Sequence, residues 1–244
     1  MARGLKEASL PILLPAEAPA PAGSDGHRAR MRARLLRAGS AALADYEMLE
    51  MVLYIALPRQ DTKALARALL AAFGSFAAVC TAPVNALLAV KGLGESGAAT
   101  LKLVQAAALR LAQGELADRP LLSNWDRLIA YLTAVLAREK TEQARVLFLD
   151  NRNHLLADEV VGRGTVNHTP IYPREVVRRA LELQASALIL VHNHPSGDPR
   201  PSAEDVAMTQ EVKQAAAALG IALHDHLVIG DGRWCSLRQE GLIA

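Results

Sequence analysis

The chain has 244 residues, which allows one large domain or two of modest size. It is 51% hydrophobic but only 4% aromatic, so a core has to be built from Leu, Ala and Val. No apolar run approaches the ~20 residues that span a bilayer, and Cys80 and Cys235 are too far apart in the sequence to suggest a disulfide framework or a cysteine zinc site. We therefore expect a cytoplasmic protein without a membrane partner.

The net charge of +2 is unevenly divided along the chain. Residues 1–120 carry +4 and residues 121–244 carry −2, so any contact with nucleic acid is expected in the N-terminal half. Ala and Pro dominate residues 1–27, which predicts a disordered tail. Arginines then crowd the next ten residues, where one helix face could contact phosphate, although a solvated face explains them more simply. These arginines are Arg28, Arg30, Arg32, Arg34 and Arg37.

Residues 28–113 have the pattern of a compact all-α module. Pro, Gly and Ser punctuate the turns, and apolar residues recur at helical spacing between them. Helices are predicted over 46–56, 62–73, 83–89 and 98–111.

Residues 90–99 resemble the helix-hairpin-helix signature, in which an apolar residue and two glycines precede a second helix. Gly92 and Gly94 would let the backbone pass close to a phosphate, and the free N–H groups of the following helix favour an anion. Lys91 and Lys102 could add positive charge. The motif implies non-specific, salt-sensitive DNA binding, while a plain helical hairpin with a glycine cap is the alternative.

Residues 114–120 lack apolar periodicity and end in Pro, which predicts a linker to a domain over 121–244. Strands interleaved with helices in that domain indicate an α/β or α+β fold, with a mixed sheet flanked by helices. The helices are predicted over 123–138, 173–184 and 202–219, and the strands over 145–150, 154–161, 187–191, 221–229 and 233–237.

Residues 188–205 carry the chemistry. His192 and His194 continue an apolar strand, so both imidazoles should point to one side. A stiff loop with three prolines leads to Ser202 and Asp205, which open a helix. Two imidazoles and a carboxylate suit one zinc ion per chain, and three protein ligands leave a fourth position for water. The alternatives are a simple capping box and two ordinary polar histidines at a sheet end.

The pattern His192-x-His194, seven residues, Ser202, two residues, Asp205 is the signature of the JAMM (MPN-plus) metallopeptidase domain. The surrounding residues resemble the bacterial RadC family, from about Asp45 to the C-terminus. The resemblance implies a layered JAMM-like domain preceded by a helix-hairpin-helix-like module. It also implies that zinc-activated water hydrolyses a peptide or isopeptide bond in an unidentified peptide or protein substrate.

The resemblance also implies two catalytic side chains. JAMM domains use an upstream Glu as general base, and Glu142 occupies that position although the next two residues depart from the RadC pattern. Glu139 is the competing candidate. The motif further implies that Ser202 donates its hydroxyl to the oxyanion of the intermediate.

A second hypothesis is a DNA-associated repair or processing factor, as the RadC name suggests. Such a protein would be a nuclease or a non-catalytic adaptor, with the helical module binding DNA. His224 and His226 form another His-x-His without a third ligand in the sequence, so we expect them to be structural or, with Asp225, to orient a site histidine. Asp198 is an alternative metal ligand that the spacing disfavours relative to Asp205.

Overall fold

The computed structural model describes residues 24–117, 120–164 and 171–243, which fall into two compact units, Met1–Lys102 and Leu103–Ala244. The expected disordered tail lies outside the described residues over 1–23, and its last four positions belong instead to the first helix. No helix of the described residues is both long enough and apolar enough to cross a membrane.

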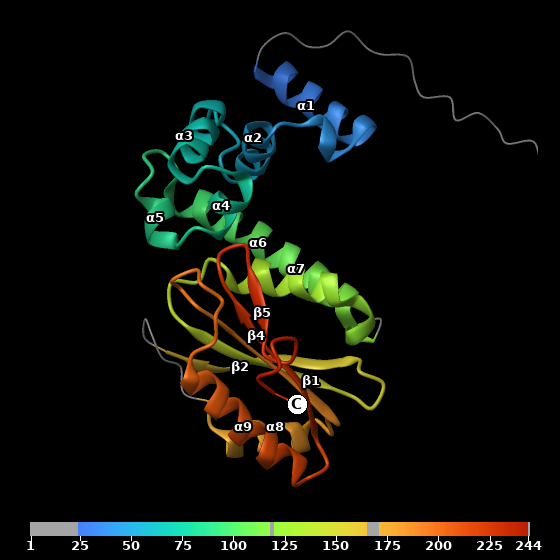
Figure 1. Ribbon diagram of the computed structural model, residues 1–244. Coiled ribbons are helices and arrows are strands. Elements are labelled where there is room, and N and C mark those ends of the chain that lie inside the picture. The colour runs from blue at the N-terminus through green and yellow to red at the C-terminus, as the bar shows by residue number, and fades with distance from the viewer. Residues whose placement is uncertain (1–23, 118–119, 165–170, 244) are drawn as a thin grey trace, which may run out of the picture. The chain divides into compact units, whose positions relative to one another are not determined.

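The N-terminal unit is helical, as predicted (Figure 1). Its core is built from fully buried leucines, because aromatic residues are scarce in this chain. Asp45 accepts a hydrogen bond from the Phe76 backbone N–H, which ties the start of one helix to the start of another. The elements are α1 (Ser24–Ala38), a 3-10 turn (Ser40–Ala42), α2 (Asp45–Ala56), α3 (Lys63–Phe73), α4 (Phe76–Thr81), α5 (Val84–Leu88) and the start of α6 (Gly94–Ala117).

Helix α6 is longer than predicted at both ends. Gly114 was expected to begin a linker, but the helix continues through it to Ala117. A glycine costs a helix interior about 1 kcal/mol relative to Ala. Leu116 is 1% exposed in the core of the second unit, and its burial outweighs that cost. The expected linker is therefore helical over its first four residues.

The C-terminal unit contains a five-stranded mixed sheet, which confirms the predicted fold class. The strand order is β2-β1-β3-β4-β5, with β3 and β4 parallel and every other neighbouring pair antiparallel. The predicted hairpin of the first two strands is confirmed. The strands are β1 (Gln143–Leu149), β2 (Leu155–Arg163), β3 (Ala187–Asn193), β4 (Ala222–Ile229) and β5 (Trp234–Ser236).

Helices cover both faces of this sheet (Figure 1). Helix α7 (Trp125–Leu136), preceded by a 3-10 turn (Leu121–Asn124), packs on one face. Helices α8 (Pro173–Glu182) and α9 (Ala203–Ala217) pack on the other. All seven residues of β3 are buried, as its continuous apolar run predicts for a central strand. The histidines thus follow the most enclosed strand of the sheet.

Candidate metal centre

The site forms where β3 ends and α9 begins. His192 is inside β3, and the His194 backbone N–H still donates to the Ile229 carbonyl at 2.9 Å, which prolongs the pairing with β4. The chain then crosses the proline-containing loop and enters α9 at its N-cap, Ser202. Because a strand and a helix fix its two ends, the loop holds Asp205 opposite the imidazoles.

The loop lies directly on the turn between β4 and β5. Gly197 has a φ of +83°, which favours glycine, and its carbonyl accepts from the Asp231 backbone N–H at 3.2 Å. A Cβ added to Gly230 would lie 2.3 Å from the Gly197 oxygen. The close approach of these two backbones therefore requires glycine at position 230.

Three donor side chains converge. The Nε2 atoms of His192 and His194 are 2.9 Å apart, and they lie 3.3 Å and 3.6 Å from the two carboxylate oxygens of Asp205. In the described part of the chain, these are the three side chains whose donor atoms gather closely enough to share a metal ion. Two nitrogen ligands of a tetrahedral zinc lie about 3.4 Å apart, so this donor set fits zinc in both chemistry and spacing.

His194 is oriented by the loop. Its Nδ1 lies 2.8 Å from the Asp198 carbonyl oxygen, which can only accept, so Nδ1 carries a proton and Nε2 is the nitrogen that faces His192 and Asp205. The Asp198 carboxylate instead accepts from the Arg200 guanidinium at 2.8 Å. Asp198 thus contributes its backbone carbonyl, while its side chain is outside the cluster, and the alternative ligand set with this carboxylate is wrong.

Electrostatics favour a charged carboxylate beside the histidines. Burial alone would raise the pKa of Asp205, but hydrogen bonds with His192 and His194 outweigh it and hold that pKa well below its usual range. The hydrogen bond with Asp205 raises the pKa of His194, against the opposing effect of burial. A negative charge at the centre of the cluster is what a cation site requires.

Glu142 lies next to the cluster, immediately before β1. Ala144 pairs with His192, so continuing this antiparallel register places Glu142 opposite His194 on the same face. Its side chain is buried, and its negative charge contributes to the raised pKa of His194. Glu142 is not a member of the three-residue donor group. Glu142 therefore lies near the three donor side chains without being one of them, and its role as general base stays a prediction.

Asn193, between the two histidines, points to the opposite face of β3. Its Oδ1 accepts from the Gln143 backbone N–H at 2.8 Å. Its Nδ2 donates to the carbonyls of Glu139 and Thr141 at 3.4 Å and 3.2 Å. The buried amide thus holds in place the segment that carries Glu142, a role that residue types and spacing do not reveal.

Ser202 forms the N-cap of α9 that the capping-box interpretation predicts. Its Oγ accepts from the Asp205 backbone N–H at 3.1 Å and donates to Asp205 Oδ2 at 2.7 Å. The Ser202 backbone N–H donates to the same carboxylate oxygen at 2.7 Å. These contacts hold Asp205 in place, and the oxyanion role of the hydroxyl stays a prediction.

The second His-x-His pair is split by a β-bulge in β4. Leu188 pairs with Leu223 and Ile189 pairs with Asp225, so position 224 is skipped. His224 contacts Asn153 in the β1–β2 turn at 2.7 Å. His226 instead contacts the candidate metal site, with its Nε2 2.8 Å from His192 Nδ1. The sequence allows a role in orienting a site histidine but does not show which of the two residues has it, because that depends on which strands are neighbours.

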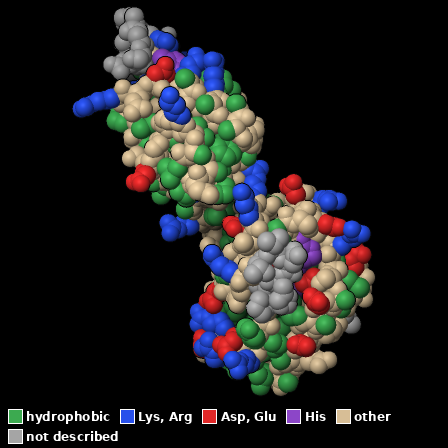
Figure 2. All heavy atoms as spheres, turned by 90° about the vertical axis from the view of Figure 1, so that its left-hand side faces the viewer, with side chains coloured by type: hydrophobic (Ala, Val, Ile, Leu, Met, Phe, Trp, Pro, Cys, Tyr) green, Lys and Arg blue, Asp and Glu red, His purple; other side chains and the backbone are tan. Residues whose placement is uncertain are grey.

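The predicted DNA-binding residues lie in the helical unit. Gly92 and Gly94 have φ values of +93° and +64°, so the turn between α5 and α6 uses glycine as the helix-hairpin-helix motif requires. Lys91 is exposed. The Lys102 ammonium, however, donates to the Cys80 carbonyl at 3.1 Å, at the C-terminal end of α4. On the face shown in Figure 2, several Lys and Arg side chains of the helical unit lie close together, and others stand alone.

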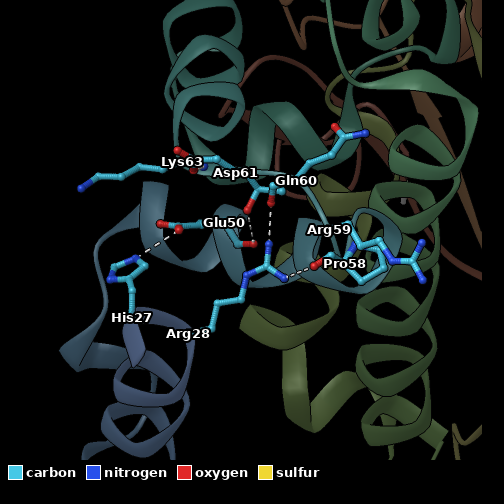
Figure 3. A pocket seen from close by; sticks show the side chains of 9 residues that line it. His27, Arg28, Glu50, Pro58, Arg59, Gln60, Asp61 and Lys63 are labelled. Carbon is cyan, nitrogen blue, oxygen red and sulfur yellow. Dashed lines mark hydrogen bonds and ion pairs between the residues drawn. The ribbon is translucent and has the colours of Figure 1, made fainter. Parts of the chain in front are cut away.

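The helical unit also contains a pocket of about 630 Å³ between α1 and the loop after α2 (Figure 3). Two of the side chains that line it, Arg28 and His27, are engaged by neighbouring groups. Arg28 donates to the Pro58 and Gln60 carbonyls, and His27 lies 3.1 Å from the buried Glu50 carboxylate. Arg28 therefore anchors α1 to this loop, which gives one of the clustered arginines a structural role.

Comparison with known proteins agrees with this geometry. Residues 122–242 match the model of the RadC-like JAB domain, and residues 26–99 match that of the UPF0758 N-terminal domain. A UPF0758 protein of Rhodobacter capsulatus is 58% identical over 213 residues, covering 87% of this chain and all of that protein. The chain belongs to the RadC (UPF0758) family. A second relative, a UPF0758 protein of Ruegeria pomeroyi, is 54% identical over 217 residues, covering 89% of this chain and 97% of the relative.

Proposed function

We propose that this RadC-family protein is a zinc-dependent hydrolase of the JAMM type, which uses one ion per chain to cleave a peptide or isopeptide bond. The observation that carries the proposal is the convergence of His192, His194 and Asp205 beside the buried Glu142. The JAB-domain family to which the C-terminal unit belongs includes peptidases and often binds zinc, which supports the same conclusion.

The residues divide the chemistry among them. A zinc ion bound by the three ligands would lower the pKa of a bound water from ~15.7 to roughly 7. Glu142 takes the proton of the attacking water and delivers it to the leaving amine. Ser202 donates its hydroxyl to the substrate oxygen that becomes negative, which requires the hydroxyl to turn away from Asp205. Asn193 keeps the Glu142 segment in position throughout.

The test separates the base from the ligands. Purified protein should contain one zinc per chain, and chelation should abolish cleavage of a peptide and isopeptide library. Glu142→Gln should retain the zinc and lose at least about 100-fold in turnover, because a general base contributes roughly 10²–10⁴-fold. Glu139→Gln, in an exposed residue of the same segment, is the matched control and should remain active. An active Glu142→Gln enzyme would remove Glu142 from the mechanism, and a protein that binds no zinc would remove the proposal.

A DNA-associated role is the second candidate, either as a nuclease or as a non-catalytic adaptor. It is supported by the two left-handed glycines at the turn before α6 and by the exposed Lys91 beside them. Binding through backbone N–H groups would be independent of DNA sequence and weakened steeply by salt. Titration of fluorescent duplex DNA at 50 and 200 mM salt tests it. Binding that is absent at both concentrations would exclude this role for the helical unit.

A further inference from the structure

A buried chain of hydrogen bonds runs behind the metal ligands. His226 of β4 has no exposed surface and lies between His192 of β3 and Thr209 of α9, which is equally buried. His226 Nε2 is 2.8 Å from His192 Nδ1, and His226 Nδ1 is 2.6 Å from Thr209 Oγ1. Thr209 Oγ1 is in turn 2.5 Å from the backbone carbonyl of Asp205. The chain begins at one ligand and ends at the backbone of another.

The direction of each hydrogen bond follows from its last acceptor. A carbonyl oxygen can only accept, so Thr209 must donate its single hydroxyl proton to Asp205. The Thr209 oxygen then has only acceptor capacity for His226, so His226 carries its proton on Nδ1. A neutral His226 therefore presents a lone pair at Nε2, and His192 must donate from Nδ1. This leaves Nε2 as the His192 nitrogen that faces His194 and Asp205, where it can bind an ion.

The two histidine ligands are thus oriented by different devices. His194 donates its Nδ1 proton to a loop carbonyl, that of Asp198. His192 donates to His226 on the neighbouring strand. His226 is in turn held by Thr209 of α9, which donates to the backbone carbonyl of Asp205. Displacing α9 would therefore disturb one ligand directly and a second through the hydrogen-bond chain.

We propose that His226 and Thr209 are positioning residues that hold His192 as its Nδ1-protonated tautomer, with Nε2 ready to bind the ion. This inference rests on the proposed metal-binding function. Metal-bound histidines commonly donate their second nitrogen to a carboxylate or carbonyl, and loss of that partner costs about 10- to 100-fold in metal affinity. Here a buried histidine and threonine take the place of that partner.

The first test needs neither metal nor a variant. Long-range ¹H–¹⁵N correlation spectra of metal-free protein, with ¹⁵N-labelled histidine, report which nitrogen of each imidazole is protonated. We expect Nδ1–H on His192 and on His226. A His192 without a proton on Nδ1 would overturn the proposal, even if the protein binds zinc.

The second test measures zinc affinity by competition with a chelating dye. Thr209→Val and His226→Leu should each weaken zinc binding by about 10- to 100-fold, since each breaks the hydrogen-bond chain. Thr209→Ser keeps the hydroxyl, and His226→Gln keeps both an acceptor and a donor, so these two should retain affinity close to wild type. His224→Ala, in the same strand but facing Asn153, is the control and should bind zinc normally.

The outcomes separate this inference from the proposed function. If wild-type protein binds no zinc while His192 is protonated at Nδ1, the hydrolase proposal fails and the assignment of the tautomer stands. If wild-type protein binds zinc and both Thr209→Val and His226→Leu bind it as tightly, the positioning role fails and the metal site stands. If Thr209→Val and His226→Leu do not fold, the spectra of the wild-type protein still decide.

Discussion

Two short stretches of this chain have residue spacings that predict a binding site. The predicted side chains come together in only one of them. In the C-terminal unit, His192, His194 and Asp205 converge until their donor atoms nearly touch. In the helical unit, the glycines adopt the expected left-handed backbone, but Lys102 is engaged with the carbonyl at the end of α4. The two stretches look comparable in the sequence, yet only the first assembles its predicted side chains around one point.

The difference has a physical origin. The histidine stretch runs from a fully buried strand into a capped helix, so its side chains are fixed by the period of the strand and by the cap. Burying polar groups is tolerated only when they are hydrogen-bonded, and every site histidine has such a partner. The lysines of the other stretch have long, flexible side chains, so the backbone spacing does not fix the positions of their ammonium groups.

The largest expected effect is the loss of a metal ligand, which tests the site of the first stretch directly. Asp205→Ala should lower zinc affinity by more than the ~100-fold that loss of an orienting partner costs, because it removes the anionic donor itself. Asp198→Ala is the matched control, since that carboxylate pairs with Arg200 and its backbone carbonyl is retained. Isothermal titration with zinc measures both variants. Equal losses in the two would contradict the assignment of Asp205 as the carboxylate ligand.

A steric change should come next. Gly230→Ala places a methyl group against the Gly197 carbonyl, so we expect a loss of roughly 1–3 kcal/mol in the free energy of unfolding. Zinc affinity should fall with it, because the same loop carries the carbonyl that orients His194. Gly114→Ala, at an exposed position within α6, should instead stabilise by about 1 kcal/mol. Urea unfolding measures both, and a harmless Gly230→Ala would show that the loop can shift freely.

Ser202 offers a smaller effect with two readouts. Ser202→Ala should cost about 1 kcal/mol of stability as a lost N-cap, whereas Ser202→Gly should cost only a few tenths. If the hydroxyl serves the oxyanion, both variants should lose turnover to the same extent, whatever their stability. Melting temperature and cleavage rate, measured side by side, distinguish the roles. Activity that follows stability would assign Ser202 to capping alone.

The smallest expected effects lie in the helical unit. They could contradict the conclusion that the second stretch does not bring its predicted side chains together. Lys91→Ala should weaken duplex DNA binding and reduce the slope of log affinity against log salt by about one. Lys102→Ala should leave that slope unchanged and cost about 0.5–1.5 kcal/mol of stability, through loss of its hydrogen bond to Cys80. Anisotropy titrations and urea unfolding measure the two effects. The reverse result would place Lys102 on the DNA-binding surface.

Residue spacing predicted the parts of the site that lie within one strand or one helix. It did not predict the parts that depend on which strands and helices are neighbours. The alternation along β3, the cap at Ser202 and the mixed sheet could be inferred from residue types and spacing. The sequence could not show which of His224 and His226 reaches the site, nor that Thr209 contributes, because both depend on β4 lying beside β3 and α9 packing across them. The continuation of α6 through Gly114 was missed for the same reason, since a buried Leu116 decides it.

The position of Asn193 between two ligands has a consequence for how the site can fail. A single strand presents imidazoles on one side and, on the other, the amide that holds the Glu142 segment. Any local opening that separates β3 from β1 therefore displaces the two imidazoles and the Glu142 segment in the same event. In the proposed enzyme, loss of metal and loss of proton transfer should therefore be cooperative, with no partly active state between the intact site and the open one.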